Sequence, residues 1–360
     1  MERTIRTYLD HAATTPMTPH ARSAVAAAMA DWANPSSPHA EGRRARAAVE
    51  AARSAVAAAY GWTGETLFTS GASESLGIVL NRALVDRVLV SAVEHDAVLR
   101  ASGRATTIPV SSDGRIDPDT LAGALVGDGR ALVAIQWANS ETGVRQPIAT
   151  LARIIHGAGA LLLVDAAQMP AGADVDVAEH ADFVALSAHK RGGPPGVGAL
   201  LVRDLATLSP TGGQERGYRA GTENLPGLAG YAAALVEPED TARLAALRDL
   251  LDDAIRRSGG EIVAEGTPRH PAIGAYRMPG VAATTQLIRL DMAGFAVSAG
   301  SACASGSLKP SHVLAAMGWD ETAGREVVRV SFGRPTTEAE VAAFIAAWRD
   351  VARATRRFVQ

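Results

Sequence analysis

The segment ALLLVDAAQMPAGADVDVAEHADFVALSAHK (160–190) contains two short runs that are apolar throughout, ALLLVD (160–165) and DFVALS (182–187). Strands that are apolar on both faces are typical of a parallel sheet covered by helices on both sides. Asp165 closes the first run, and Lys190 follows the second by three residues. Because ligands of such sheets gather where strands end and helices begin, this segment indicates both the fold and the place of a site.

Similar runs continue on both sides of this segment. Further short apolar runs predict strands, and amphipathic stretches before and between them predict helices, with Gly61 just past the end of the first helix. The further strand candidates are TLFTS (66–70), RVLVS (87–91), ALVAIQW (131–137) and VGALLV (197–202), and the helix candidates are 40–59, 73–83, 95–102, 117–126 and 147–157. This alternation predicts an α/β fold around a mainly parallel sheet.

The amino-acid composition of the chain changes after about residue 235. We expect a second, smaller α+β domain there, in agreement with a length of 360 residues and a typical domain size of ~150 residues. The helices and strands expected in it lie at or near 238–257, 261–264, 272–277, 326–330 and 337–355.

Composition and charge exclude several classes of protein. Hydrophobic residues make up 47% of the chain and charged residues 20%, and 35 basic and 38 acidic side chains give a net charge of −3. That balance excludes a disordered chain and gives no electrostatic reason for direct nucleic-acid binding. The N-terminal MERTIRTYLD lacks the apolar core of a signal peptide, and no stretch approaches the ~20 apolar residues of a membrane span. We therefore expect a cytoplasmic protein without a membrane segment.

Cysteine and lysine are scarce. The single cysteine, Cys303, excludes an intramolecular disulfide and a multi-cysteine zinc site, and we expect no metal centre. Lys190 and Lys309 are the only lysines among 35 basic residues, and neither follows the glycine of a Walker-A phosphate loop. A lysine retained in an arginine-rich chain is a candidate for an amine that must lose its proton and react, the alternative being that both are chance survivors.

Three side chains near the quoted strands suit a pyridoxal cofactor. The amine of Lys190, partly desolvated at a strand end, could form a Schiff base with an aldehyde, although a surface lysine would also fit this position. Asp165 could hold the pyridinium nitrogen of pyridoxal phosphate protonated, or it could simply cap a helix. Gln168 could hydrogen-bond the phenolic oxygen of the ring.

Other loops carry residues that could bind a phosphate, transfer protons or act as a nucleophile. In LFTSGASES (67–75) a strand passes through Gly71 into a helix, which offers free N–H groups to a phosphate or forms an ordinary turn. His95 could lie on a cofactor ring and shuttle protons, or it could be a surface or capping residue. Cys303 lies among small residues in VSAGSACASGSLKP, which favours an accessible nucleophile over a buried packing residue.

Taken in order, ten motifs make the chain resemble the cysteine desulfurases, enzymes related to the class V aminotransferases. Each motif is weak alone, but together they cover nearly the whole chain in the order of that family. They are YLDHAATTP (8–16), NPSSPHAEGRRAR (34–46), LFTSGASES (67–75), VEHDAVL (93–99), ANSETGVRQPI (138–148), LLLVDAAQ (161–168), LSAHK (186–190), RAGTEN (219–224), GSACASGS (300–307) and VRVSFGRPTTEAEV (328–341).

The resemblance implies a fold-type I pyridoxal-phosphate enzyme with a mainly parallel, seven-stranded sheet. A large cofactor-binding domain would span 15–235. A small domain would combine 1–14 with 236–360 and carry the loop of Cys303. A homodimer with both active sites at its interface is implied as well.

The resemblance also assigns roles by position in the motifs. Lys190 matches the Schiff-base lysine, Asp165 the pyridinium partner, and His95 the acid–base group stacked on the ring. The other matches are Gln168 for the phenolic oxygen, Ala72, Ser73, Ser187 and His189 for the phosphate, Thr222 for the phosphate from across the dimer interface, Asn139 and Arg329 for the substrate carboxylate, and Cys303 as the acceptor of sulfur.

The activity implied is conversion of L-cysteine to L-alanine, with the sulfur left as a persulfide on Cys303. The GSACASGS loop resembles the subfamily with a longer, flexible loop, which passes the persulfide to an acceptor such as an iron–sulfur scaffold or a tRNA-thiolation enzyme. Two alternatives stay open: a selenocysteine lyase or other pyridoxal-phosphate-dependent β-eliminating lyase, and a non-catalytic sulfur-relay subunit. The thiol favours the desulfurase, because direct elimination needs no protein thiol.

The chain departs from the family pattern at Ser73, where threonine is more usual, and at Pro195, where lysine is frequent. The first change keeps a hydroxyl, and the second alters the local surface or a partner contact. The chain is also shorter than many members, which bears on partner-docking surfaces more than on the catalytic core.

Overall fold

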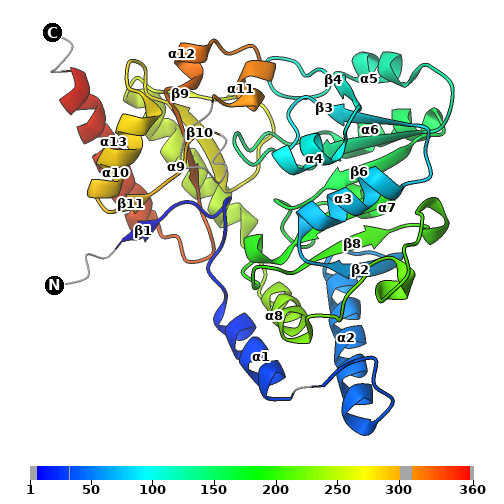
Figure 1. Ribbon diagram of the computed structural model, residues 1–360. Coiled ribbons are helices and arrows are strands. Elements are labelled where there is room, and N and C mark those ends of the chain that lie inside the picture. The colour runs from blue at the N-terminus through cyan, green and yellow to red at the C-terminus, as the bar shows by residue number, and fades with distance from the viewer. Residues whose placement is uncertain (1–5, 32, 301–309, 357–360) are drawn as a thin grey trace.

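The structure is a computed structural model that describes residues 6–31, 33–300 and 310–356. Figure 1 shows two parts side by side, a larger one that ends near residue 236 and a smaller one formed mainly by the residues after it. Cys303, the predicted sulfur acceptor, lies outside the described residues.

Within these residues, the larger part contains one seven-stranded sheet. Its strands, in spatial order, are β2 (Glu65–Thr69), β8 (Gly198–Val202), β7 (Phe183–Ser187), β6 (Leu161–Asp165), β5 (Ala131–Gln136), β3 (Arg87–Ser91) and β4 (Thr106–Ile108). The neighbouring pairs are parallel except for the two that involve β8, which runs antiparallel to β2 and β7. The prediction of an α/β fold with a mainly parallel sheet of seven strands is confirmed.

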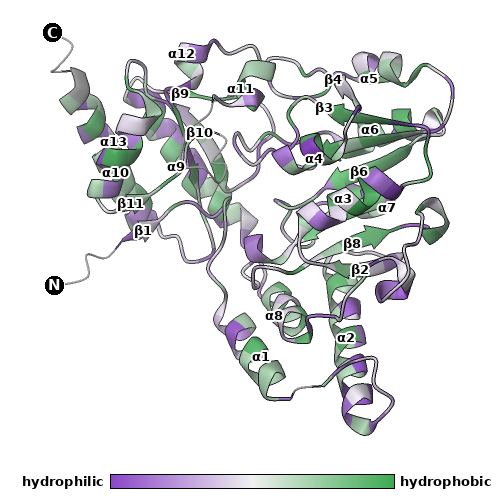
Figure 2. Cartoon of the chain, viewed as in Figure 1, coloured by the Kyte–Doolittle hydropathy of each residue, from purple (hydrophilic) through white to green (hydrophobic). Residues whose placement is uncertain are grey.

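Helices cover both faces of this sheet, as its apolar strands require. Because side chains alternate along a strand, Leu132 and Val133 of β5 belong to cores on opposite faces. The helices of the Leu132 face are α3 (Ala72–Arg82) and α4 (Asp96–Ala101), and those of the Val133 face are α2 (Ala40–Ala59), α5 (Pro118–Leu125), α6 (Ile148–Gly157), α7 (Val175–His180) and α8 (Leu225–Val236). Figure 2 shows hydrophobic residues concentrated along the strands between these two layers.

The smaller part has its own sheets and core. Strands β12 (Val327–Ser331), β10 (Ile273–Arg277) and β9 (Glu261–Ile262) form an antiparallel sheet in that order, and β1 (Thr7–Tyr8) pairs in parallel with β11 (Phe295–Ala296). Its helices are α9 (Thr241–Arg257), α10 (Ala283–Met292), α11 (His312–Ala316), α12 (Glu321–Gly324) and α13 (Glu338–Arg356). Leu9 is buried in the same core as Leu251 and Phe344, so the N-terminal residues add to a core made by the C-terminal ones. In the described ranges, no helix is both long and apolar enough to cross a membrane.

The helices and strands predicted from the sequence occur at their expected places, with ends shifted by a few residues. Helix α8 was missed, and so was α1 (Pro19–Ala30), which packs against it. The sequence of α8, LPGLAGYAAALV, is apolar on nearly every side and therefore lacks the 3.6-residue pattern of a surface helix. Its glycines permit close packing, because a Cβ on Gly230 would lie 2.5 Å from the side chain of Val25 in α1.

A buried ion pair fixes the segment after β8 to β2. Glu215 and Arg216 both have left-handed backbones, with φ of 47° and 57°, which non-glycine residues rarely adopt. The Glu215 carboxylate accepts two hydrogen bonds from the guanidinium of Arg53 (2.6 and 3.2 Å) and one from the N–H of Phe68 in β2 (2.9 Å). The side chains of Arg53 and Glu215 are 9% and 0% exposed, so Glu215 depends on Arg53 for compensation, while Arg53 also pairs with the more exposed Glu50 (3.0 Å).

We expect Glu215→Ala to lower the free energy of unfolding by about 3 kcal/mol, because it removes the buried counter-charge of Arg53 and leaves it only the more exposed Glu50. Urea unfolding of the purified protein measures this loss. Asp350→Ala is the matched control, since Asp350 pairs with Arg353 at an exposed position and its removal should be nearly neutral. Equal, small effects of the two substitutions would contradict a structural role for the buried pair.

Candidate active site

A cavity of about 450 Å³ lies between the two parts, at the carboxyl ends of β5, β6 and β7. This is where a parallel sheet is expected to bind its ligand. Thr222 is exposed and is not among the described residues that line the cavity. Cys303 lies outside the described residues, but Gly300 and His312, on either side of it, both line the cavity. Of the twelve predicted site residues, the ten that line it are Ala72, Ser73, His95, Asn139, Asp165, Gln168, Ser187, His189, Lys190 and Arg329.

Lys190 ends a single 3₁₀ turn (Ala188–Lys190) that directly follows β7. Gly192 then turns the chain with φ of 82°, and a Cβ there would lie 2.7 Å from Cγ2 of Thr18, so only glycine fits beside the N-terminal segment. Burial lowers the pKa of the Lys190 amine from 10.5 to about 8, against the opposing effect of the Asp165 carboxylate. The amine therefore releases its proton much closer to neutral pH than an exposed lysine does.

Asp165 and Gln168 lie at the end of β6. Asp165 is its last residue and is 8% exposed, and its Oδ1 accepts the N–H of Ala167 (3.0 Å), which orients the carboxylate. Gln168 is held by its Nε2, which donates to the carbonyl oxygen of Ala12 (2.9 Å). The Oε1 of Gln168 is buried and has no partner among the described residues. A buried acceptor of this kind calls for a donor from within the cavity, as a phenolic hydroxyl would be.

The turn between β2 and α3 is shaped to bind an anion. Gly71 has φ of 150°, which residues with a side chain rarely adopt, and a Cβ on Gly198 of β8 would lie 2.6 Å from the Cα of Gly71, so the close approach of the two backbones requires glycine at position 198. No side chain of the described residues caps α3, so the N–H groups at its start, including those of Ala72 and Ser73, have no helical partner. These donors and the helix dipole favour a phosphate group at this end of the cavity.

His95 is both a helix cap and a cavity residue. It is the N-cap of α4, where its Nδ1 accepts the N–H of Ala97 (3.1 Å), and this bond assigns the proton of the neutral ring to Nε2. Burial lowers the pKa of His95, although the carboxylate of Asp165 opposes this shift. The ring is therefore held as a neutral imidazole at the cavity wall.

The two residues predicted to receive a substrate carboxylate differ in their contacts. Arg329 on β12 reaches the cavity from the smaller part and donates to the carbonyl oxygen of Ser140 (2.8 Å) and to Oδ1 of Asp10 (2.7 Å). Asn139 instead shapes its own loop, because its Oδ1 accepts backbone N–H groups two and three residues ahead and its Nδ2 donates to the carbonyl oxygen of Val93 (3.0 Å). Arg329 is therefore the stronger candidate for binding a carboxylate.

Several acidic residues in or beside the cavity had no role in the sequence-based prediction, among them Glu94, which lines it, and Asp10, which does not. Glu94 is buried, and its Oε1 accepts hydrogen bonds from the hydroxyl of Ser91 (2.6 Å) and the N–H of Gln136 (2.9 Å). Burial raises the pKa of Glu94 to about 8, so this carboxyl group is mostly neutral at pH 7. The sequence signal that could have identified these two residues is their position inside two of the motifs, Glu94 in VEHDAVL and Asp10 in YLDHAATTP.

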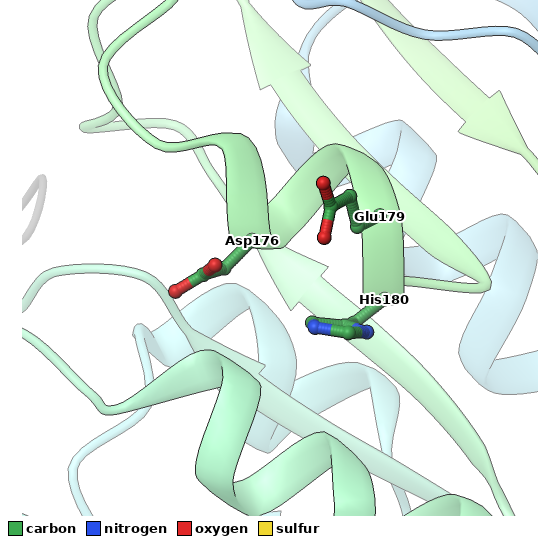
Figure 3. Close-up of side chains that lie close together, drawn as sticks. All are labelled: Asp176, Glu179 and His180. Atoms are coloured by element: carbon green, nitrogen blue, oxygen red, sulfur yellow. The ribbon is translucent and has the colours of Figure 1, made fainter.

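Outside the cavity, one group of described residues has the chemistry of metal ligands. Asp176, Glu179 and His180 lie on the short helix α7, and one potential ligand atom from each lies within 4.8 Å of the others (Figure 3). Side chains three and four residues apart on a helix are neighbours in any case. We assign no function to this group.

Comparisons with known proteins agree with this geometry. The family model described as "Aminotransferase class-V" matches residues 7–344. A protein of Cereibacter sphaeroides named "Cysteine desulfurase" is 38% identical over 360 residues, which cover 93% of each chain. The X-ray structure of a NifS-like protein from Rickettsia africae has a TM-score of 0.87 at 28% identity, covering 97% of this chain and 99% of its own. A structure described as "SspA in complex with cysteine" has a TM-score of 0.77 at 28% identity, covering 91% and 99%.

The lowered pKa of Lys190 predicts how the apoprotein takes up pyridoxal phosphate. Only a neutral amine attacks an aldehyde, so the rate of uptake should rise with pH, reach half its maximum near pH 8 and then level off. Absorbance of the bound cofactor after mixing, followed from neutral to alkaline pH, measures this rate. Because the carboxylate of Asp165 raises the pKa of Lys190, Asp165→Asn should move the midpoint to lower pH. A wild-type midpoint near the ordinary value of 10.5 would contradict the assignment of this amine.

Proposed function

We propose that this chain, which belongs to the aminotransferase class-V family, is a pyridoxal-phosphate-dependent cysteine desulfurase. In this reaction L-cysteine becomes L-alanine, and its sulfur is left as a persulfide on Cys303. The observation that carries the proposal is the cavity of about 450 Å³, around which an amine of lowered pKa, a buried carboxylate and an uncapped helix N-terminus meet. The name of the relative from Cereibacter sphaeroides supports the same activity.

Pyridoxal phosphate supplies an aldehyde that an amine can join and a pyridine ring that withdraws electrons when its nitrogen is protonated. The residues of the cavity fit this group. Lys190 offers the amine, Asp165 the carboxylate for the ring nitrogen, and the start of α3 the N–H groups for the phosphate. The unpaired Oε1 of Gln168 argues most directly for a partner that enters the cavity. The remaining residues proposed to contact the cofactor are Ala72, Ser73, His95, Ser187 and His189.

Lys190 and His95 are the residues that we propose move protons. Because burial lowers its pKa, the Lys190 amine can accept a proton from the substrate Cα. His95 would donate a proton only as an imidazolium, after it has taken one up from the substrate, and would then return to the neutral form that burial favours. A positioned acid or base of this kind typically contributes about 10²–10⁴ in rate. Arg329 would hold the α-carboxylate through its guanidinium and so fix the Cα–H bond relative to Lys190.

Cys303 is the proposed nucleophile. Gly300 lines the cavity, and three residues of extended chain span at most ~11 Å, so the Cys303 thiol can reach a substrate held there. Its thiolate attacks the substrate sulfur, an S–S bond forms and the substrate Cβ–S bond breaks. The electron pair of that bond stays with the substrate carbon, which takes up a proton as alanine forms. The persulfide then passes to an acceptor protein, such as an iron–sulfur scaffold or a tRNA-thiolation enzyme.

We further propose a cytoplasmic homodimer as the working form. Thr222 is exposed and does not line the cavity described above, although the motif RAGTEN resembles a phosphate-binding segment. The segment that carries it is anchored a few residues earlier by Glu215. An exposed threonine on a segment anchored in this way is what contact with the cofactor phosphate of a second subunit requires.

We expect Cys303→Ala to release no sulfide from L-cysteine while it still binds pyridoxal phosphate and L-cysteine, because only the sulfur acceptor is lost. Sulfide assays in the presence of a reductant and cofactor absorbance measure the two properties. Ser307→Ala, in the same segment, is the control and should keep both. Undiminished sulfide release by Cys303→Ala would indicate direct elimination, and turnover of selenocysteine without Cys303 would identify a selenocysteine lyase instead.

The two lysines allow the covalent attachment to be located. Borohydride reduction followed by peptide mapping should find the pyridoxyl group on Lys190 and none on Lys309, because Lys190 lines the cavity and burial lowers the pKa of its amine. Lys190→Ala should abolish the reducible linkage, whereas Lys309→Ala should retain it. A wild-type protein that gains no cofactor absorbance when pyridoxal phosphate is added would instead favour the non-catalytic sulfur-relay subunit.

A further inference from the structure

Arg329 has a fixed backbone. It lies in β12 opposite Ala275 of β10, and it exchanges backbone hydrogen bonds with Ser298 (2.7 and 3.2 Å). The whole residue is 8% exposed. Because the backbone cannot move, the groups that hold the guanidinium decide where its remaining donors point.

Two of the five N–H donors of this guanidinium are occupied by protein groups. Nη1 donates to the carbonyl oxygen of Ser140 (2.8 Å), and Nη2 donates to Oδ1 of Asp10 (2.7 Å). The Nε of Arg329 is buried and finds no partner in the part of the chain that the structure describes. An unpaired buried donor is costly, and a carboxylate accepts from two neighbouring guanidinium N–H groups at once. Each Nη carries a second N–H besides the one it gives to the protein, and because Arg329 lines the cavity, these donors can receive a carboxylate bound there.

Asp10 is itself held in place. Its carbonyl oxygen accepts the hydroxyl of Tyr8 (3.1 Å), it forms a backbone bridge with Ser331, and the preceding Leu9 is completely buried. Its side chain is 21% exposed, and Asp10 is not among the described residues that line the cavity. It therefore makes no direct contact with a ligand in the cavity and acts on it through Arg329, apart from a minor electrostatic effect on Lys190 that L-alanine and ethylamine would experience alike.

We propose that Asp10 is a positioning residue that holds the guanidinium of Arg329 in the orientation that receives the α-carboxylate of the substrate. The identity of that substrate rests on the proposed function, but the need for a carboxylate can be measured without turnover. Removal of Asp10 also takes away a negative charge, which strengthens the attraction of Arg329 for an anion. Orientation outweighs this effect, because the bound carboxylate needs two aligned N–H groups, whereas solvent at the partly exposed Asp10 screens its charge.

L-Alanine and ethylamine differ only in the carboxylate, so their binding to the holoenzyme isolates its recognition. The change in cofactor absorbance during titration reports the affinity of each. Asp10→Ala should weaken the binding of L-alanine by about tenfold or more and that of ethylamine by less than about twofold. For L-cysteine the same substitution should raise KM more than it lowers kcat. Asp10→Asn keeps an oxygen that can accept from Nη2 and should recover part of the L-alanine affinity, and it serves as the informative variant if Asp10→Ala does not fold.

Asp291→Ala is the matched control, because Asp291 pairs with Arg6 at an exposed position, and it should change the affinity for neither ligand. Equal weakening of both ligands by Asp10→Ala, or tighter binding of L-alanine, would overturn the positioning role. Failure of the proposed function and failure of the positioning role give different results in this experiment. A holoenzyme that shows the Asp10 dependence but forms no alanine from L-cysteine refutes the proposed function alone, and one that forms alanine without that dependence refutes the positioning role alone.

Discussion

The segment from Tyr8 to Thr18 is the physical connection on which the site depends, because it is hydrogen-bonded to both parts of the molecule. On the smaller part, the carbonyl oxygen of Leu9 accepts the N–H of Ser331 (2.9 Å), and on the larger part Thr15 donates its N–H to the carbonyl oxygen of His189 (2.8 Å). These are backbone bonds, so they hold whatever side chains the segment carries. They set the distance between Arg329, two residues before Ser331, and Lys190, one residue after His189.

Burial gives this cavity an unusual balance of charge. It moves the pKa values of Lys190, His95 and Glu94 in the directions that favour their neutral forms. Arg329 keeps a counter-charge in Asp10. At pH 7 the Lys190 amine, with a pKa of about 8, still carries its proton most of the time and balances the charge of Asp165, whereas the His95 imidazole is held neutral. When Lys190 gives up its proton, Asp165 loses this counter-charge, which is costly for a buried carboxylate. The protonated nitrogen of a pyridine ring is the kind of cation that would complete this arrangement.

The sequence could predict those features of the fold and the site whose signal lies within a few neighbouring residues. The run at 131–136 and the lysine after β7 were recognisable because apolar strands and a rare residue type stand out within a few positions. Helix α8 could not be recognised in this way, because it is buried between two other helices and has no polar face. The contact of Asp10 with Arg329 joins residues 319 positions apart and exists only once the chain is folded. For Asn139 the sequence identified the motif but not the contacts of the side chain, which hydrogen-bonds to its own loop and to Val93.

The described residues on either side of the segment that carries Cys303 lie at the cavity. On one side Gly300 lines the cavity, and on the other Ser311 donates its hydroxyl to Glu141 (2.6 Å) while His312 donates its Nε2–H to the carbonyl oxygen of Glu94 (2.9 Å). Both ends are therefore fixed at the cavity. The two attachment points tie the segment that carries Cys303 to the cavity lined by Arg329 and Lys190, which is the arrangement that the proposed transfer of sulfur to its thiol requires.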